Sequence, residues 1–493
     1  MKKSTESSRF FYFKNWISLA GAVVAMGSLF SFLLLFAIDS STGGSNPYLG
    51  ILTYLTSPAF LILGLGMMLA GWLTHRRQIR NSSSGESSLT FSLDLSNASH
   101  RNKLMAFTAG TFLFLILSAF GSYKTYHFTE SVTFCGEACH EVMEPEYTTH
   151  KLGSHSRISC AECHIGSGAT WYVKSKISGL YQVYSVAFNK YSRPIATPIH
   201  NLRPAQETCE HCHWPQKFTG NLDRTYAHYL TDDENTPAIV RLSLKVGGSD
   251  PRKGPVGGIH WHMNVANKIE YIATDERRQV IPFVRVTNQA GEVTEYSTKA
   301  FKGPVNPADL RVMDCMDCHN RPAHIYQAPN DSVDNAIYLG HIDRELKGVK
   351  LLSVALLTGK YNTKDEAMAA IAQGIEKAYP GDNRVADTVR ELQAIYQSNF
   401  FPLMKVSWAS YPSNIGHKDW PGCFRCHDNE HKTADGKKSV DNTNCNACHT
   451  ILAQGKDAET LGTLHPDGLI FDHPGGDTFG SLCSECHKGG NME

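Results

Sequence analysis

Three uncharged, apolar stretches occupy the first quarter of the chain: Trp16–Ile38, Leu49–Leu73 and Leu104–Tyr123. About 20 apolar residues cross the hydrocarbon core of a bilayer as a helix, so the pattern predicts three transmembrane helices. A cleaved signal peptide is the alternative for the first stretch, because basic residues precede it. That stretch is longer than the roughly 7–15 apolar residues of a signal sequence, and no small-residue cleavage site follows it, which favours a retained helix.

Basic residues are distributed unevenly around these stretches. The N-terminal tail carries Lys2, Lys3, Arg9 and Lys14, the 75–103 loop carries Arg76, Arg77, Arg80, Arg101 and Lys103, and residues 39–48 carry no Lys or Arg. The positive-inside rule places the tail and the 75–103 loop in the cytoplasm. Residues 1–123 are therefore predicted to form a multi-pass anchor in a bacterial cytoplasmic (inner) membrane, with everything after Tyr123 in the periplasm.

The hydrophobic period changes twice in the exported part. Ala238–Val246 and Gln279–Thr287 alternate between apolar and polar residues among Gly- and Pro-rich turns, which predicts a β-rich insert at 221–314. Residues 331–398 have a helical pattern, in which Thr363 and Glu366 resemble a capping box before an Ala-rich run. The remainder is predicted to be rich in loops.

Charge excludes one class of partner. The chain has 47 Lys+Arg against 47 Asp+Glu, so its formal net charge is zero. A nucleic-acid-binding protein normally carries a basic face or domain, and none is indicated here. A hydrophobic content of 42% is typical of an ordered protein.

All 14 cysteines lie after Tyr123, and they fall into seven pairs, each followed at once by a histidine. Six pairs read Cys-x-x-Cys-His: Cys160/Cys163/His164, Cys209/Cys212/His213, Cys315/Cys318/His319, Cys423/Cys426/His427, Cys445/Cys448/His449 and Cys483/Cys486/His487. The pair Cys135/Cys139/His140 comes first in the chain and has one extra residue between its cysteines.

This triplet is the attachment motif of c-type haem. Two thiols about one turn apart add to the two vinyl groups of the porphyrin, and the adjacent histidine lies under the iron as an axial ligand. Zinc ribbons and disulfides also use paired cysteines, but neither requires a histidine at the next position. The motifs predict seven covalently bound c-type haems, each with an iron.

The second axial ligands are expected among the remaining histidines and one methionine. Fourteen exported histidines stand outside the motifs: His127, His150, His155, His200, His211, His228, His260, His262, His324, His341, His417, His431, His465 and His473. The candidate metal ligands are His150, His155, His200, His260, His262, His324, His417, His431, His473 and Met143. Met143 follows His140 by three residues and either ligates the first haem or packs against its porphyrin. Two histidines on most irons favour electron transfer over small-ligand chemistry.

Longer segments carry a family resemblance. CHEVMEPEYTTH, SHSRISCAECHIGSGATWYVKSKISG and HNLRPAQETCEHCHWPQKF resemble the NapC/NirT type of membrane-anchored multihaem cytochromes c over about residues 105–220. GGIHWHMN, CMDCHNRPAH, NIGHKDWPGCFRCHDNEH and CNACHTILAQG resemble a longer, seven-haem branch of that family. The predicted fold is thus a membrane-anchored multihaem cytochrome c with three transmembrane helices and a loop-rich, mainly helical seven-haem domain with a small β-rich insert. Its predicted parts are the anchor at 1–123, haems one to three at 124–220, the insert at 221–314, and haems four to seven at 315–493.

The resemblance implies a quinol dehydrogenase that passes electrons to periplasmic c-type cytochromes. It implies that the first haem faces the quinol with Met143 as its ligand, that His150, His155 and His200 are distal ligands, and that Lys174 or Lys176 borders the quinol site. Gln182 is the nearest polar residue where the family often has a carboxylate. Bis-histidine haems have low potentials, which favours menaquinol over ubiquinol.

Two further features of the sequence bear on this mechanism. Glu141, Glu144 and Glu146 are expected to help accept the quinol protons. The aromatic, basic stretch Trp171–Lys190 has helical spacing and is expected either at the membrane interface or packed on haem. Two rival functions are an electron-relay subunit without a quinone pocket and a terminal reductase of a small oxyanion.

Overall fold

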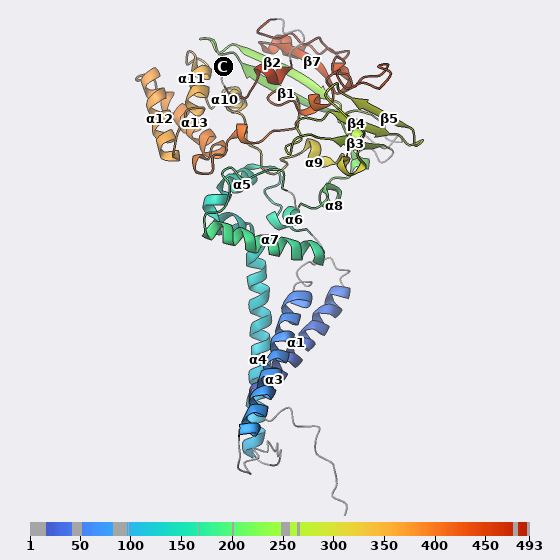
Figure 1. Ribbon diagram of the computed structural model, residues 1–493. Helices are drawn as coiled ribbons and strands as arrows, with labels where there is room; N and C mark the ends of the chain where they lie inside the picture. Colours follow the sequence, from blue (N-terminus) through green and yellow to red (C-terminus); the bar gives the residue numbers. More distant parts are fainter. Residues whose placement is uncertain are drawn as a thin grey trace, which may run out of the picture. The chain divides into compact units, whose positions relative to one another are not determined.

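The computed structural model describes residues 16–41, 52–81, 96, 98–166, 168–199, 202–247, 257–263, 267–476 and 482–490. They form two compact units (Figure 1). The first consists of Met1–Cys135 and Ser159–Val183, and the second of Gly136–Ile158 and Tyr184–Glu493. This division cuts across the ranges expected from the sequence, because the chain leaves the first unit at the first cysteine motif and returns to it for the second.

Long apolar helices dominate the first unit. They are α1 (Trp16–Ser41), α3 (Ser57–Asn81), preceded by a π-helical turn at Leu52–Thr56, and α4 (Ala98–Thr129). Among the described residues, two segments are long and apolar enough to cross a membrane, Trp16–Ile38 and Ser57–Thr74. The expectation of three spans is corrected to two candidates. The stretch Leu104–Tyr123 lies inside α4, a continuous helix that also takes in the polar residues Arg101 and Lys124.

Small residues allow α1 and α3 to pack closely. A Cβ atom on Gly21 would lie 2.6 Å from the carbonyl oxygen of Gly64, and one on Gly64 would lie 2.6 Å from the backbone nitrogen of Ala25. Outside this contact the helices expose large apolar side chains such as Met26 and Leu69. Close backbone packing at small residues, with apolar side chains facing outward, is typical of helices in a bilayer.

Two antiparallel sheets form part of the second unit. One has the order β1-β2-β7, with β1 at Leu222–Tyr229, β2 at Pro237–Leu244 and β7 at His449–Gly455. The other has the order β5-β4-β3-β6, from β3 (Lys268–Ile272), β4 (Phe283–Thr287), β5 (Val293–Ser297) and β6 (Arg311–Val312). The strands at 222–312 are not a self-contained insert, because β7 begins at the histidine of the sixth cysteine motif and pairs with β2.

A bundle of four helices supplies most of the apolar core of the second unit (Figure 1). The helices are α10 (Pro329–Tyr338), α11 (Val349–Leu357), α12 (Lys364–Ala378) and α13 (Val385–Asn399). The helical prediction for 331–398 is confirmed. Thr363 caps α12 by accepting a hydrogen bond from the Glu366 amide at 3.1 Å, while the Glu366 carboxylate accepts from the amide of Asn362 instead of Thr363.

Candidate haem sites and a buried ion pair

Each cysteine motif folds into a short helical turn that presents its two thiols together. In the third, fourth, fifth and seventh motifs the histidine N–H donates to the carbonyl oxygen of the first cysteine at 2.8–3.1 Å. Side-chain caps hold two of these turns, because Ser159 caps α6 (Cys160–His164) and Asp314 caps α9 (Cys315–Cys318). All 14 cysteines are described, and none of them forms a disulfide.

The second cysteines of two motifs differ in how far the protein encloses them. Cys163 of the second motif is half-buried within α6, whereas Cys486 of the seventh is exposed at the end of α15 (Cys483–Cys486). The sequence pattern does not distinguish these two residues, but the structure does. The attachment roles of both residues rest on the Cys-x-x-Cys-His pattern and stay predictions.

The extra residue of the first motif has a structural explanation. Phe134–Ala138 forms a π-helical turn. Such a turn accommodates one more residue than an α-helical turn. Cys135 and Cys139 therefore remain one turn apart despite the longer spacing, and α5 (His140–Leu152) begins directly after them. Met143 is half-buried on α5.

Five motif histidines each lie opposite a second histidine. The pairs and their ring-centroid separations are His155–His213 at 6.0 Å, His260–His319 at 6.2 Å, His262–His427 at 5.9 Å, His417–His449 at 6.2 Å and His473–His487 at 5.9 Å. Two imidazoles on opposite sides of one metal ion have centroids roughly 6 Å apart, because each metal–nitrogen bond is about 2 Å and each ring adds about 1 Å. The described residues thus fit five irons with two histidine ligands each.

Burial favours the protonation state that ligation requires. It lowers the pKa of His262, His319, His417, His449 and His487. A lowered pKa keeps the imidazole neutral at physiological pH, and neutral imidazole is the form that binds a metal.

Successive motifs in the second unit are spatial neighbours. The Cys209 and Cys315 thiols share a hydrogen bond. Burial raises the pKa of Cys318 to about 11, with a further contribution from Cys423 of the next motif. Burial likewise raises the pKa values of two later thiols, aided by a cysteine of the preceding motif: Cys448 by Cys423, and Cys483 by Cys445. From the third motif to the seventh, each motif therefore lies near the next one in the chain.

The sequence comparisons agree with this geometry. Residues 97–197 match the NapC/NirT cytochrome c family, N-terminal region. The chain is 40% identical over 497 residues to the cytochrome c-type protein ImcH of Geobacter sulfurreducens, covering 97% of this chain and 95% of that protein. The chain belongs to the NapC/NirT cytochrome c family. No solved structure matches it. Membership confirms a membrane-anchored electron-transport protein with covalently bound c-type haem.

Two predicted distal ligands, His431 and His200, are not among the five histidine pairs. His431 is fully buried, and both ring nitrogens bond to protein atoms: Nδ1 to the Asp428 carboxylate at 2.8 Å and Nε2 to the Ile281 carbonyl at 2.7 Å. The prediction that His431 ligates a haem is wrong, because neither nitrogen is available. His200 lies outside the described residues.

His150 and His324 face each other instead of facing a motif histidine. Their ring centroids are 6.3 Å apart, and neither residue belongs to an attachment motif. His324 Nδ1 lies 3.0 Å from the Glu146 carbonyl, and buried His150 Nε2 lies 2.9 Å from the Ile158 carbonyl. Their ligand roles stay predictions.

An ion pair in the first unit involves a residue that the sequence reading missed. Lys176 of α7 (Ala169–Ala187) bonds to the carboxylate of Glu130, which follows the end of α4. The Glu130 side chain is only 4% exposed. Burial raises the pKa of Glu130 above its usual value even though Lys176 acts in the opposite direction. Lys176 thus has a carboxylate partner, but 46 positions earlier in the chain.

The other predicted residues of α7 lie apart from this pair. Lys174 is exposed and lies 4.7 Å from the centroid of the Trp171 ring. Gln182 is exposed and bonds to Ser178 at 3.4 Å, so it does not replace the expected carboxylate. Glu130 was invisible to the sequence reading because nothing in its spacing relates it to Lys176.

Proposed function

We propose that the protein oxidises a quinol, with menaquinol favoured over ubiquinol, and passes the electrons through seven c-type haems to periplasmic c-type cytochromes. The observation that carries the proposal is the set of five histidine pairs, each spaced for one iron, at successive attachment sites that lie near one another. Bound haem would supply one-electron redox chemistry. The protein supplies the ligands, the attachment points and the short separations between successive sites.

The histidine pairs favour electron transfer over a terminal reductase. A reductase needs an iron with an open coordination position for its substrate, whereas two histidines on one iron leave none. In the third to seventh motifs a second histidine occupies the opposite side. Met143, half-buried on α5, is the proposed ligand of the first haem.

The ion pair gives the quinol reaction a proton acceptor. Oxidation of a quinol to a quinone releases two electrons and two protons, and a nearby base has to accept each proton. Glu130 is buried, its pKa is raised, and its charge and that of Lys176 both act on the Cys135 thiol of the first motif. We assign Glu130 as one acceptor and Lys176 as the residue that orients its carboxylate. Glu141, Glu144 and Glu146 stay secondary candidates.

The anchor completes the proposal. α7 exposes Ile177, Leu180 and Tyr181 on one side, and we place this apolar face in the membrane interface. We place the α1 and α3 segments in the bilayer and the haem-bearing part with its two sheets in the periplasm.

Rapid mixing with a reduced menaquinone analogue tests the proposal. Detergent-purified protein should show fast haem reduction that a quinone-site inhibitor abolishes, and Lys176→Met should slow it. Lys299→Met replaces an exposed lysine elsewhere and should reduce at the wild-type rate. Slow, inhibitor-insensitive reduction in protein that dithionite still reduces fully would instead support an electron relay.

A further inference from the structure

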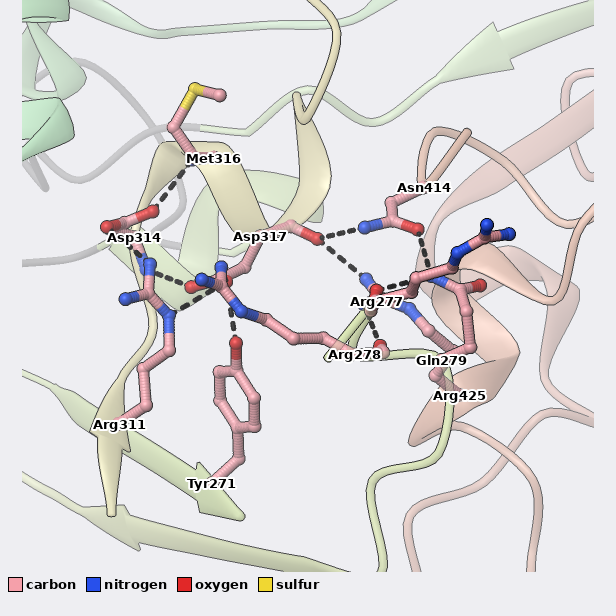
Figure 2. Close-up of polar contacts among 10 residues, drawn as sticks. All are labelled: Tyr271, Arg277, Arg278, Gln279, Arg311, Asp314, Met316, Asp317, Asn414 and Arg425. Atoms are coloured by element: carbon pink, nitrogen blue, oxygen red, sulfur yellow. Dashed lines mark hydrogen bonds and ion pairs between the residues drawn. The ribbon is translucent and has the colours of Figure 1, made fainter. Parts of the chain in front are cut away.

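The fourth and fifth motifs are joined by a cluster of buried polar contacts that haem attachment does not require (Figure 2). Asp317 lies between the cysteines of the fourth motif and is 3% exposed. Arg425 lies between the cysteines of the fifth. Two guanidinium nitrogens of Arg425 donate across the cluster, one to the Asp317 carbonyl at 2.7 Å and one to the Arg278 carbonyl at 2.8 Å. A single side chain therefore connects the two motifs directly.

The carboxylate of Asp317 anchors the other side of the cluster. Its Oδ1 accepts hydrogen bonds from Tyr271 at 2.6 Å and from Arg278 and Arg311 at 3.1 Å each. Its Oδ2 accepts from the Asp314 amide at 2.8 Å. Figure 2 shows these side chains converging on Asp317 from β3, from the turn at Arg278 and from β6. Four bonds to one buried carboxylate fix the turn of the fourth motif in place.

Arg278 contacts both Asp317 and Arg425 and takes an unusual backbone conformation. Its φ of 55° lies in the left-handed region, which residues other than glycine rarely adopt. The Asp275 carboxylate holds the turn by accepting from the Gln279 and Val280 amides at 2.9 and 2.8 Å. The result presents the carbonyl of Arg278 to Arg425 and its guanidinium to Asp317. The contacts of Arg278 with Asp317 and Arg425 thus stabilise its strained backbone conformation.

Arg425 carries a positive charge that no carboxylate neutralises directly. Its three hydrogen bonds all go to carbonyl oxygens, the third to Gly422 at 2.8 Å, and among the described residues it forms no ion pair. Burial raises the pKa of Cys426 to about 12, and Arg425 acts against that shift, as it does at Cys318 and Cys423. Attached sulfurs do not titrate, so these shifts serve only to locate the charge beside both motifs.

The distal side of the two sites is joined as well. His260 and His262 lie two residues apart on one short helix, Ile259–Met263, and they face His319 and His427 respectively. Residues on a single turn therefore connect the two sites on the distal side, while Arg425 connects their attachment sides.

We propose that Arg425 is a positioning residue that holds the fourth and fifth haem sites together and raises the reduction potentials of both haems by its unneutralised charge. Arg425 is partly buried, and a positive charge that water screens only partly favours the reduced state of a nearby iron, because reduction adds an electron. Shared between two sites, one charge raises both potentials together and keeps electron exchange between the two haems close to balanced. This role requires c-type haem at both motifs but not quinol oxidation.

An equilibrium redox titration tests the proposal without any quinol. Purified full-length protein is titrated with soluble mediators, following haem absorbance and the low-spin ferric electron paramagnetic resonance signals. In Arg425→Gln, two haems should become harder to reduce by about tenfold in the ratio of reduced to oxidised form, which is 59 mV for a one-electron couple. Arg425→Lys keeps the charge and should retain the wild-type potentials. Arg390→Gln, the same change at a side chain that is 76% exposed, should leave all the potentials unchanged.

Haem content decides how the titration is interpreted. If Arg425→Gln carries the wild-type complement of haem and titrates like the wild type, the proposal is overturned. A shift spread evenly over all the haems also overturns it, because the charge lies beside two motifs only. If Arg425→Gln does not mature, Arg425→Lys decides alone. A fall in two of its reduction potentials that lowers the ratio of reduced to oxidised haem by about tenfold would contradict the charge effect. Because the mediators replace quinol, loss of the quinol reaction leaves each of these outcomes unaffected.

Discussion

Replacing Lys176 by methionine removes the partner of a buried carboxylate and should move the pH dependence of quinol oxidation. The side chains of Lys176 and Glu130 are 30% and 4% exposed. Two unit charges at the usual ion-pair separation of about 4 Å attract by roughly 4 kcal/mol at an effective dielectric constant of about 20. The partial exposure of Lys176 reduces this to about 1.5–3 kcal/mol. Losing this attraction should raise the pKa of Glu130 further, and at 1.36 kcal/mol per tenfold change in the ionised fraction the pH profile should move by about one to two pH units.

The direction of the effect follows from the state that accepts a proton. Only the ionised carboxylate is a base, so a higher pKa moves the onset of quinol-driven haem reduction to higher pH by about one to two units. At a pH below the new pKa the rate should fall about 10- to 100-fold. The same shift affects stability. Because burial raises the pKa of Glu130 above 4.5, the folded state binds this proton more tightly than the unfolded chain, and the free energy of unfolding falls as the pH rises through that window. In Lys176→Met, the pH range over which the free energy of unfolding falls should extend to higher pH.

The assay is stopped-flow haem reduction by a menaquinol analogue at a series of pH values. Lys176→Arg keeps the charge and should follow the wild-type pH profile. Glu130→Gln has no carboxylate to ionise, so its rate should lack the rise with pH that the ionisation of Glu130 causes. Reduction by dithionite should be the same in every variant, which separates loss of the quinol reaction from loss of haem. An unchanged profile in Lys176→Met, or a wild-type profile in Glu130→Gln, would refute Glu130 as the proton acceptor.

Three other results should follow from the structure. His431→Gln should leave every haem low-spin and should lower the free energy of unfolding by about 1–3 kcal/mol, since both nitrogens of the buried ring bond to protein. His262→Gln should instead produce one high-spin haem in the absorbance spectrum. A high-spin signal from His431→Gln would contradict the assignment of His431 as a residue that ligates no haem. Lys350→Met should lower the free energy of unfolding by about 3–5 kcal/mol in denaturant titrations, because it leaves the Asp334 carboxylate, 5% exposed, without the cation that now binds it. Gly64→Leu should separate α1 from α3 and lower the thermal stability of the protein in detergent, as a Cβ there meets the backbone of the facing helix at 2.6 Å, and unchanged stability would show that the two helices do not depend on this contact.

Local chemistry made much of this cytochrome predictable. Covalent attachment requires two thiols and a histidine within a few consecutive residues, so each predicted site can be recognised from the sequence without knowledge of the fold. The same holds for the apolar stretch Trp16–Ile38 and for the four helices at 329–399, whose patterns repeat along the chain. The irregular first motif is compatible with the same role, because a π-helical turn absorbs its extra residue, and its attachment of haem stays a prediction.

Axial ligation shows where sequence reasoning fails. His431 and His417 both flank the fifth motif and are indistinguishable by spacing. In the fold, His417 faces His449 of the sixth motif, whereas His431 bonds to Asp428 and Ile281. A distal ligand approaches the iron through space, so its position in the chain carries no information about which haem it serves.

The sequence by itself determined what groups the protein holds: attachment cysteines, proximal histidines, apolar anchor segments and a family of electron-transfer proteins. Tertiary structure alone decided how those groups are combined. It paired His260 and His262 with two different motifs, brought Glu130 to Lys176, and placed Arg425 against Asp317. The physical reason is that covalent attachment acts between neighbouring residues, whereas metal ligation, proton transfer and electrostatic tuning depend on distances that only the folded chain sets.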